Sequence, residues 1–276
     1  RTLSWGGRGR EFKSRRSDHF FWRWLESKSA IIFATFGSVD SKVRKEIINT
    51  ALQEIQSAFK NFDVRLAYTS NFMRERLKSN GVNIQSVSEQ IDVLRSEGFD
   101  EILVLPSHLT PGEEFEYKIL PFANHDVQIL TPIFSLNCDT DFDRQAFKII
   151  IDCFKTFNDE HLILIGHGSP HRHNPIYGNL QRLADSLNLH VHIGVIESTD
   201  TPNFDDVLNR LNKYKVKEVL LAPMLFNGGV HLSKDIAGDD KNSWLSRLTD
   251  KGYFVRLSLN GLGSFKSFRQ LFIEKI

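Results

Sequence analysis

Short runs of aliphatic residues alternate along the chain with longer stretches in which apolar positions recur every three or four residues. Turn-forming residues bound each run, and the runs are rich in Ile, Leu and Val, which is typical of strands buried in a parallel sheet. Six strands are predicted, at 30–36, 64–68, 101–105, 162–166, 191–196 and 218–222. The stretches between them predict amphipathic helices, for example the one with apolar positions at Val43, Ile47, Ala51, Ile55 and Phe59. Strands alternating with helices predict an α/β fold built from βαβ units.

Three segments of the first half recur in the second half in the same order. The repeated pairs are 30–38 with 161–169, 64–70 with 191–198, and 101–106 with 218–223. Their separations of 131, about 128 and 117 residues indicate a duplicated unit with loops of different length. We therefore predict two similar halves, in which the strand beginning at Ile31 and the strand beginning at Leu162 occupy equivalent positions.

The repeats also set the predicted domain organisation. We expect an N-terminal α/β domain over 29–135, a linking helix region over 136–159, and a C-terminal α/β domain over 160–276 whose final helix spans 265–276. Residues 1–28 fall outside both repeats and carry eight Lys or Arg against three Asp or Glu. Such a segment can bind nucleic acid or a membrane surface, but the expectation here is a disordered extension that is dispensable.

Composition and charge narrow the class of protein. The chain has 276 residues, 41% of them hydrophobic and 25% charged, which is ordinary for a globular protein with a real core. A formal net charge of +1 gives no reason to expect a nucleic-acid or membrane partner. Cys138 and Cys153 have no metal-binding spacing, and neither a secretory leader nor an apolar run long enough for a membrane span is recognisable, so we expect a cytoplasmic protein. A homo-oligomer is left open.

Metal-binding side chains follow three strands of the second half. His167 stands between two glycines after the strand 162–166, Glu197 follows the strand 191–196, and His231 lies eight residues past Pro223. In an open α/β sheet, ligands bind beyond the carboxyl ends of the strands. Two imidazoles and a carboxylate suit a divalent ion such as Co²⁺, Fe²⁺, Ni²⁺ or Zn²⁺. The sequence therefore predicts a metal site at this edge.

The matching positions of the first half hold Phe36, Thr69 and Glu114. Glu114 lies eight residues past Pro106, as His231 does past Pro223, so it is expected to face the same cleft from the other half. A lone His or Glu at a strand end is more often structural than a ligand, and it is the convergence of three that favours a metal site. His171 and His173 either extend the site or only lie on its loop, whereas His190 and His192 are expected to face elsewhere.

From residue 30 to residue 276 the chain resembles the class II chelatases of tetrapyrrole biosynthesis, most closely the anaerobic sirohydrochlorin cobaltochelatases. The resemblance rests on the segments 36–38, 67–70, 106–114, 166–168, 195–198, 231–244, 261–263 and 268–272. It implies two flavodoxin-like halves with the macrocycle in the cleft between them, and metal held by His167, Glu197 and His231 with Glu114 opposite. The chain departs from the family where His171 is followed by Arg172 rather than a second His, and where Val230 replaces a frequent Asp.

The implied function is insertion of a divalent metal, Co²⁺ first and Fe²⁺ or Ni²⁺ as alternatives, into sirohydrochlorin. His167 and His231 would bind the ion and accept protons, Glu197 would hold the ion until transfer, and Glu114 would take the second proton or orient the ring. The chain contains no phosphate-binding G-x-x-x-x-G-K-[ST] motif, which fits a reaction without a nucleotide. The residues expected to bind the carboxylate-rich substrate are Ser38, Thr69, Ser70, Arg74, His108 and His171.

Three other functions remain open from the sequence. A ferrochelatase would use the same fold and ligands with Fe²⁺, because the two ions share ligand types. A metal or tetrapyrrole carrier would bind in the same cleft without turnover. A phosphohistidine enzyme would use His167, although that chemistry favours an Arg beside the His, and here Gly168 and Ser169 follow.

Overall fold

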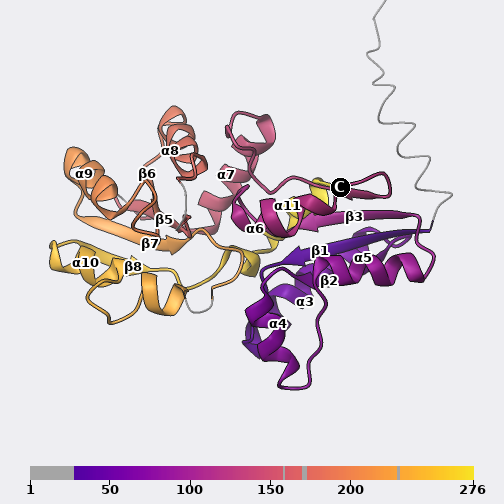
Figure 1. Ribbon diagram of the computed structural model, residues 1–276. Coiled ribbons are helices and arrows are strands. Elements are labelled where there is room, and N and C mark those ends of the chain that lie inside the picture. Colours follow the sequence, from indigo (N-terminus) through magenta and orange to yellow (C-terminus); the bar gives the residue numbers. More distant parts are fainter. Residues whose placement is uncertain (1–27, 158, 170–172, 229–230) are drawn as a thin grey trace, which may run out of the picture.

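The protein folds into two parallel four-stranded sheets in a computed structural model that describes residues 28–157, 159–169, 173–228 and 231–276, with the backbone alone at 231–233 (Figure 1). The first sheet has the order β2-β1-β3-β4 and the second the order β6-β5-β7-β8. The strands of the first sheet are β1 (Ser29–Thr35), β2 (Asp63–Tyr68), β3 (Glu101–Pro106) and β4 (Val127–Ile129). Those of the second are β5 (His161–Gly166), β6 (Val191–Val195), β7 (Glu218–Pro223) and β8 (Phe254–Leu257).

The register of the strands confirms the duplication. Ile31 in β1 lies opposite Val64 and Leu103. Leu162 in β5 lies opposite Val191 and Leu220, which are the residues that the sequence repeats pair with Val64 and Leu103. The central strands of the two sheets are therefore equivalent, as predicted.

The edge strands β4 and β8 were missed by the sequence analysis, which predicted six strands. Both are short, three and four residues long, and both are only partly buried. An edge strand with one neighbour and an exposed face needs no continuous aliphatic run, so the pattern that reveals central strands is absent from it.

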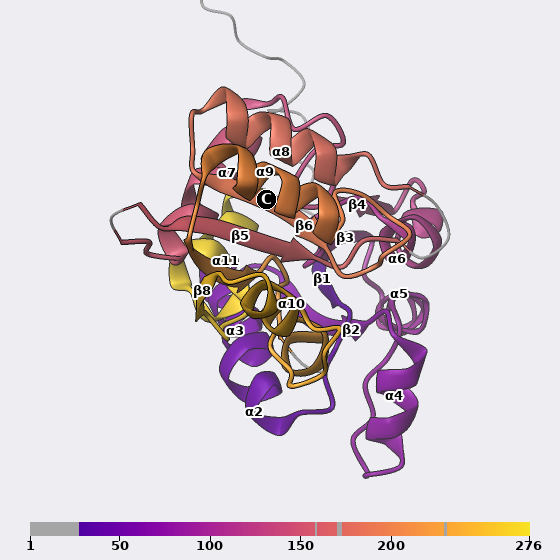
Figure 2. The same cartoon turned by 90° about the vertical axis from the view of Figure 1, so that its left-hand side faces the viewer.

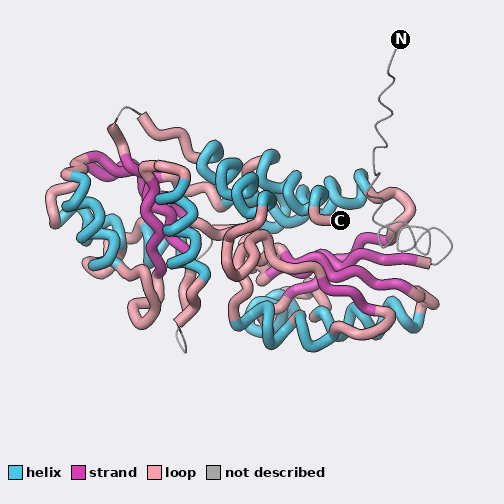
Figure 3. The backbone as a smooth tube through the Cα atoms, turned by 90° about the horizontal axis from the view of Figure 1, so that it is seen from above, coloured by secondary structure: helices cyan, strands magenta, loops and turns pink. Residues whose placement is uncertain are grey.

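Helices connect successive strands and cover both faces of each sheet (Figure 3). In the first half they are α2 (Ser41–Val43), the π-helix η1 (Arg44–Ile48), α3 (Asn49–Ala58), α4 (Asn71–Lys78), α5 (Val87–Ser96), α6 (Glu113–Lys118), the 3₁₀ helix η2 (Leu120–Phe122) and α7 (Asp141–Cys153). In the second half they are α8 (Ile176–Ser186), α9 (Phe204–Tyr214), the π-helix η3 (His231–Ile236), α10 (Trp244–Asp250), the 3₁₀ helix η4 (Leu262–Ser264) and α11 (Lys266–Glu274). None of the helices within the described residues is long and apolar enough to cross a membrane.

One hydrophobic core is shared by the two halves. Alternate residues of a strand point to opposite faces, so Phe33 and Leu164 enter the shared core while Ile32 and Ile163 enter separate cores on the outer faces. The outer core of the first sheet is closed by α5 and α6, and that of the second by α9 and α10. Figure 2 shows β5 between α8 on one side and α10 on the other. The shared core fixes the two sheets relative to each other.

The last helix, α11, packs against the first half although it follows the second half in sequence (Figure 1). The ring of Phe272 lies edge-on to that of Phe33, with centroids 5.5 Å apart. Arg269 is buried and donates two hydrogen bonds of 2.8 Å to the carboxylate of Glu54 in α3. The residue bounds of the two domains stay a prediction, and in space the chain's last helix belongs to both.

Candidate functional site

The carboxyl ends of the two sheets face each other through direct contacts between their loops. Ser169, after β5, donates a 2.7 Å hydrogen bond from its hydroxyl to the carboxylate of Glu113 at the start of α6. The side chain of Asn227, after β7, donates to the carbonyl of Gly37, after β1. The loops that hold the predicted site residues of both halves therefore form one surface.

His167 and Glu197 lie next to each other at the carboxyl ends of the adjacent strands β5 and β6. The amide of Glu197 donates to the carbonyl of His167, and the Nδ1 atom of His167 lies 4.0 Å from Oε1 of Glu197. Both side chains are partly exposed, at 41% and 31%. Two ligand atoms that each lie about 2.1 Å from an ion can be up to about 4.2 Å apart, so this pair is within reach of one ion.

The glycines on either side of His167 are required by close packing. A Cβ on Gly166 would lie 2.3 Å from the ring of Tyr177. Gly168 has a φ of 81°, and a Cβ there would lie 3.0 Å from the side chain of Val195 and 3.1 Å from that of Glu197. Only glycine allows the loop to turn this tightly while the imidazole stays beside the carboxylate.

The third predicted ligand, His231, begins η3 after β7, but its side chain lies outside the described residues, as do His171 and Arg172. Among the described side chains, no group of three or more His, Cys, Asp or Glu is arranged to hold a metal ion. The three-residue ligand set therefore stays a prediction, of which the structure places the His167–Glu197 pair.

The equivalent edge of the first half carries buried polar atoms without partners among the described residues. Oε1 of Glu114 accepts a 2.7 Å hydrogen bond from Lys118, while its Oε2 is buried and unpaired. Both ring nitrogens of His108 and the hydroxyl of Thr69 are also buried and unpaired. Burial lowers the pKa of His108 to about 4, against the opposing effect of Glu114. Unpaired buried polar groups are costly, and such atoms often mark a functional site.

The other residues expected to bind substrate already have partners in this structure. The hydroxyl of Ser38 accepts from the amide of Asp40, and Ser70 caps the start of α4. Arg74 forms an ion pair of 2.8 Å with Glu89 and a hydrogen bond with Asn71. Ser38, Ser70 and Arg74 lie near the carboxyl ends of β1 and β2, and their role toward a substrate stays a prediction.

His190 and His192 face elsewhere, as predicted. His192 is buried at the start of β6, and its Nε2 lies 2.8 Å from Nδ1 of His161, the first residue of β5. The ring of His190 stacks on that of His161. This group lies at the amino ends of the strands, across the sheet from His167.

Asp200 is a site residue that the sequence analysis missed. Its side chain is fully buried, and its carboxylate accepts hydrogen bonds from the backbone amides of Ser169, Asn174 and Thr201 and lies 2.8 Å from Nδ1 of His173. An Asp in a turn three residues after Glu197 carries no recognisable motif, so only the folded loops reveal it.

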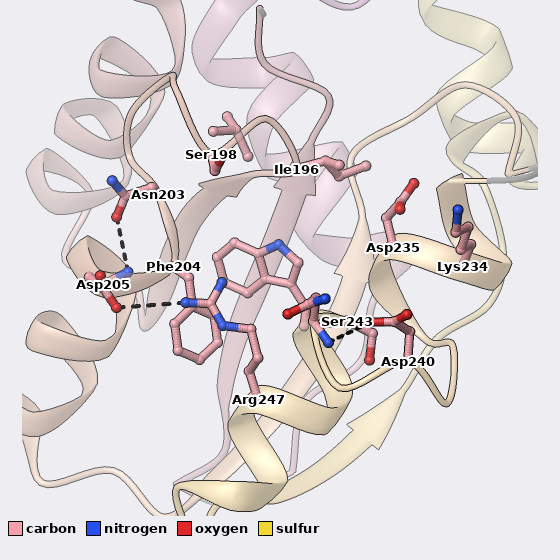
Figure 4. Close-up of a pocket in the computed structure, with 13 residues that line it drawn as sticks. Ile196, Ser198, Asn203, Phe204, Asp205, Lys234, Asp235, Asp240, Ser243 and Arg247 are labelled. Atoms are coloured by element: carbon pink, nitrogen blue, oxygen red, sulfur yellow. Dashed lines mark hydrogen bonds and ion pairs between the residues drawn. The ribbon is translucent and has the colours of Figure 1, made fainter.

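A pocket of about 540 Å³ opens beside Glu197, between β6, η3 and the starts of α9 and α10 (Figure 4). Ile196 and Ser198, the neighbours of Glu197, line it together with Lys234, Asp235 and other residues of both charges. The guanidinium of Arg247 lies over the ring of Phe204, 3.6 Å from its centroid. The pocket gives the second half a polar recess next to the candidate ligands.

Comparison with known proteins assigns the family. A model of the family described as cobalt chelatase (CbiK) matches residues 29–276. The chain is 26% identical over 261 residues to the sirohydrochlorin cobaltochelatase CbiKC of Nitratidesulfovibrio vulgaris, covering 91% of this chain and 90% of that protein. It is 24% identical over 260 residues to the sirohydrochlorin cobaltochelatase of Salmonella typhimurium, covering 90% of this chain and 95% of that protein.

Solved structures show the same fold. The structure described as SirB from Bacillus subtilis with Fe³⁺ has a TM-score of 0.57 and 16% identity, covering 90% of this chain and 94% of that chain. The sirohydrochlorin chelatase SirB from Bacillus subtilis subspecies spizizenii in complex with cobalt has a TM-score of 0.55 and 14% identity, covering 90% and 93%. The two similar halves are thus those of the class II chelatase fold, as predicted, and the chain belongs to the cobalt chelatase (CbiK) family.

Proposed function

We propose that this protein inserts Co²⁺ into sirohydrochlorin without a nucleotide. The family match over residues 29–276 supports a chelatase, and two relatives are named sirohydrochlorin cobaltochelatases. The observation that carries the proposal is the His167–Glu197 pair, with 4.0 Å between its nearest ligand atoms at the ends of two adjacent strands. An imidazole and a carboxylate are suitable ligands for Co²⁺, which is a substrate of this reaction.

Insertion requires that two pyrrole N–H protons leave as the ion enters the macrocycle. We assign the binding of the ion to His167, Glu197 and His231. An imidazole ligand can also accept a proton once the ion has left. The anionic carboxylate of Glu197 balances part of the charge of the ion before transfer. Partial exposure of His167 and Glu197 leaves them accessible to a flat macrocycle.

The first half supplies the opposing wall. Oε2 of Glu114 is buried and has no hydrogen-bond partner among the described residues. The same is true of both ring nitrogens of His108. Because burial keeps His108 uncharged at neutral pH, it can accept a hydrogen bond from a pyrrole N–H without repelling the incoming cation. We assign proton acceptance to Glu114 and orientation of the ring to His108.

An insertion assay tests the proposal. Purified protein is mixed with sirohydrochlorin and Co²⁺, Fe²⁺ or Ni²⁺ in separate reactions without nucleotide, and the change in the macrocycle's absorption spectrum is followed. We expect multiple turnovers, fastest with Co²⁺. Faster turnover with Fe²⁺ would make the protein a ferrochelatase, and stoichiometric binding with release of unmetallated macrocycle would make it a carrier.

A further inference from the structure

His173 and Asp200 form a carboxylate–imidazole pair next to the candidate metal ligands. Nδ1 of His173 lies 2.8 Å from Oδ1 of Asp200, and the hydroxyl of Thr201 lies 3.3 Å from the same nitrogen. The two partners differ sharply in exposure, since the side chain of His173 is 56% exposed and that of Asp200 is not exposed at all. One end of the pair is therefore fixed inside the protein, while the other reaches solvent.

The hydrogen bonds of Asp200 determine which nitrogen of His173 carries the proton. Three of the groups around the carboxylate are backbone amides, those of Ser169, Asn174 and Thr201, and amides can only donate. The carboxylate is thus an acceptor throughout, so Nδ1 of His173 donates to it. In the neutral ring this leaves the lone pair on Nε2, which is the atom free to take up a proton.

Asp200 also ties this pair to the predicted ligands. The Asp200 carboxylate accepts a hydrogen bond from the backbone amide of Ser169, which follows His167 by two residues. The backbone amide of Asp200 donates to the carbonyl of Glu197. The loop after β5 and the turn after β6 are therefore held by one buried carboxylate. His173 is anchored to the same two segments that position His167 and Glu197.

We propose that His173 is the proton relay of the second half, receiving at Nε2 one of the two protons that the macrocycle releases and passing it to water, while Glu114 accepts the other. For the pyrrole on this side, the N–H bond breaks, its electron pair stays on nitrogen to bind the metal, and the proton forms an N–H bond at Nε2. Asp200 remains a carboxylate and stabilises the imidazolium, as the aspartate of a Ser-His-Asp triad does for its histidine. The exposed imidazolium then loses the proton to solvent. This inference rests on the proposed function.

His173→Asn tests the relay, because an asparagine amide can still donate to Asp200 but cannot take up a proton. We expect the Co²⁺ insertion rate to fall at least about tenfold, with Co²⁺ affinity and the thermal midpoint unchanged. A soluble base, 2,6-lutidine, whose methyl groups hinder metal binding, should restore part of the rate. His125→Asn, at an exposed histidine 3.7 Å from Asp126 in the first half, is the matched control and should insert metal normally.

A second pair of variants separates proton transfer from loop positioning. Asp200→Asn leaves one oxygen for four donors. Asp143→Asn removes an equivalent buried carboxylate that accepts from Ser135 and Thr140 before α7, away from the site. We expect both to lose stability and only Asp200→Asn to lose insertion.

Four results overturn the relay. They are an unchanged rate in His173→Asn, a lower rate accompanied by an equal loss of Co²⁺ affinity, no restoration by lutidine, or a loss of insertion in Asp200→Asn while His173→Asn stays fully active. The last result would leave Asp200 with a positioning role alone. A wild-type protein that inserts no metal overturns the proposed function as well, whereas an active wild type with an equally active His173→Asn overturns the relay only.

Discussion

The two halves share one scaffold, yet their strand ends present opposite chemistry. In the second half, β5 and β6 are followed by His167 and Glu197, which lie close enough to hold one ion. In the first half, the matching strands β1 and β2 are followed by Phe36 and Thr69, which cannot bind a cation tightly, while Glu114 and His108 near β3 present unpaired polar atoms. The comparison teaches that duplication supplied two equivalent edges with different side chains. Under the proposed function, one edge holds the metal and the other receives the macrocycle.

The two edges differ in a few side chains, whereas the arrangement of their strands is the same. The shared core spans both sheets, so the two edges are held at a fixed distance by packing. Contacts such as Ser169 with Glu113 then join the loops directly. A mutation at one strand end should therefore change the chemistry of that edge without disturbing the other.

The largest effect is expected from His167→Ala, with Phe36→Leu as the control at the matching strand end. Loss of a direct ligand should lower the insertion rate by about 100-fold or more, since even indirect partners of a metal site cost about 10- to 100-fold. The thermal midpoint should barely change, because the His167 side chain is 41% exposed and buries little apolar area.

Phe36→Leu should insert metal at close to the wild-type rate. If the two variants lost activity equally, the edges would not differ in the way proposed. Full activity of His167→Ala would place the metal site elsewhere.

A smaller effect, about tenfold on the insertion rate, is expected from Glu114→Gln. The amide keeps an oxygen for Lys118 but cannot take a proton, so proton acceptance should suffer while Co²⁺ binding stays the same. The comparison variant is Glu116→Gln on the same helix, which should be active. Loss of Co²⁺ binding in Glu114→Gln would instead make Glu114 a metal ligand. It would then contradict the proposal that the second half alone binds the metal.

The sequence predicted the centre of each sheet well because buried central strands have a distinct aliphatic pattern. It also placed His167 and Glu197 after adjacent strands, as the structure has them, since strand ends in a duplicated α/β unit are fixed by the register. It could not predict the edge strands β4 and β8, nor that α11 packs on α3, because both depend on tertiary contacts such as Arg269 with Glu54. Asp200 was missed for the same reason, since three of the four hydrogen bonds of its carboxylate reach residues about thirty positions away in sequence.

In each half burial keeps a histidine neutral, His108 in the first and His192 in the second, with pKa values of about 4 and about 3. Burial also lowers the pKa of His161, which lies beside His192. In the unfolded chain His108 and His192 would both have a pKa near 6.5, so the unfolded state binds more protons below that pH. The free energy of unfolding therefore has its full value, as far as these histidines are concerned, above about pH 6.5. It declines on acidification, down to about pH 4 for the contribution of His108 and about pH 3 for that of His192.

Urea unfolding at a series of pH values measures this decline. Each histidine should contribute a slope on the order of 1 kcal/mol per pH unit within its window. His108→Gln should remove the contribution of the first half and His192→Gln that of the second. Unchanged slopes in both variants would show that these rings are not buried in the folded protein.

The smallest effect is expected from removing residues 1–27, which lie outside the described residues and outside both halves. The family match begins at residue 29, and β1 begins at Ser29. Lys28 should be kept, because its ammonium donates to the carbonyl of Glu97 and lies 4.3 Å from the centroid of the Phe99 ring. A chain beginning at Lys28 should match the full chain in Co²⁺ insertion rate and thermal midpoint, since the contacts that join the two edges in the described part of the chain need no residue before Lys28. A clear loss of either would mean that the extension takes part in the site or in folding, and that two halves alone do not make the enzyme.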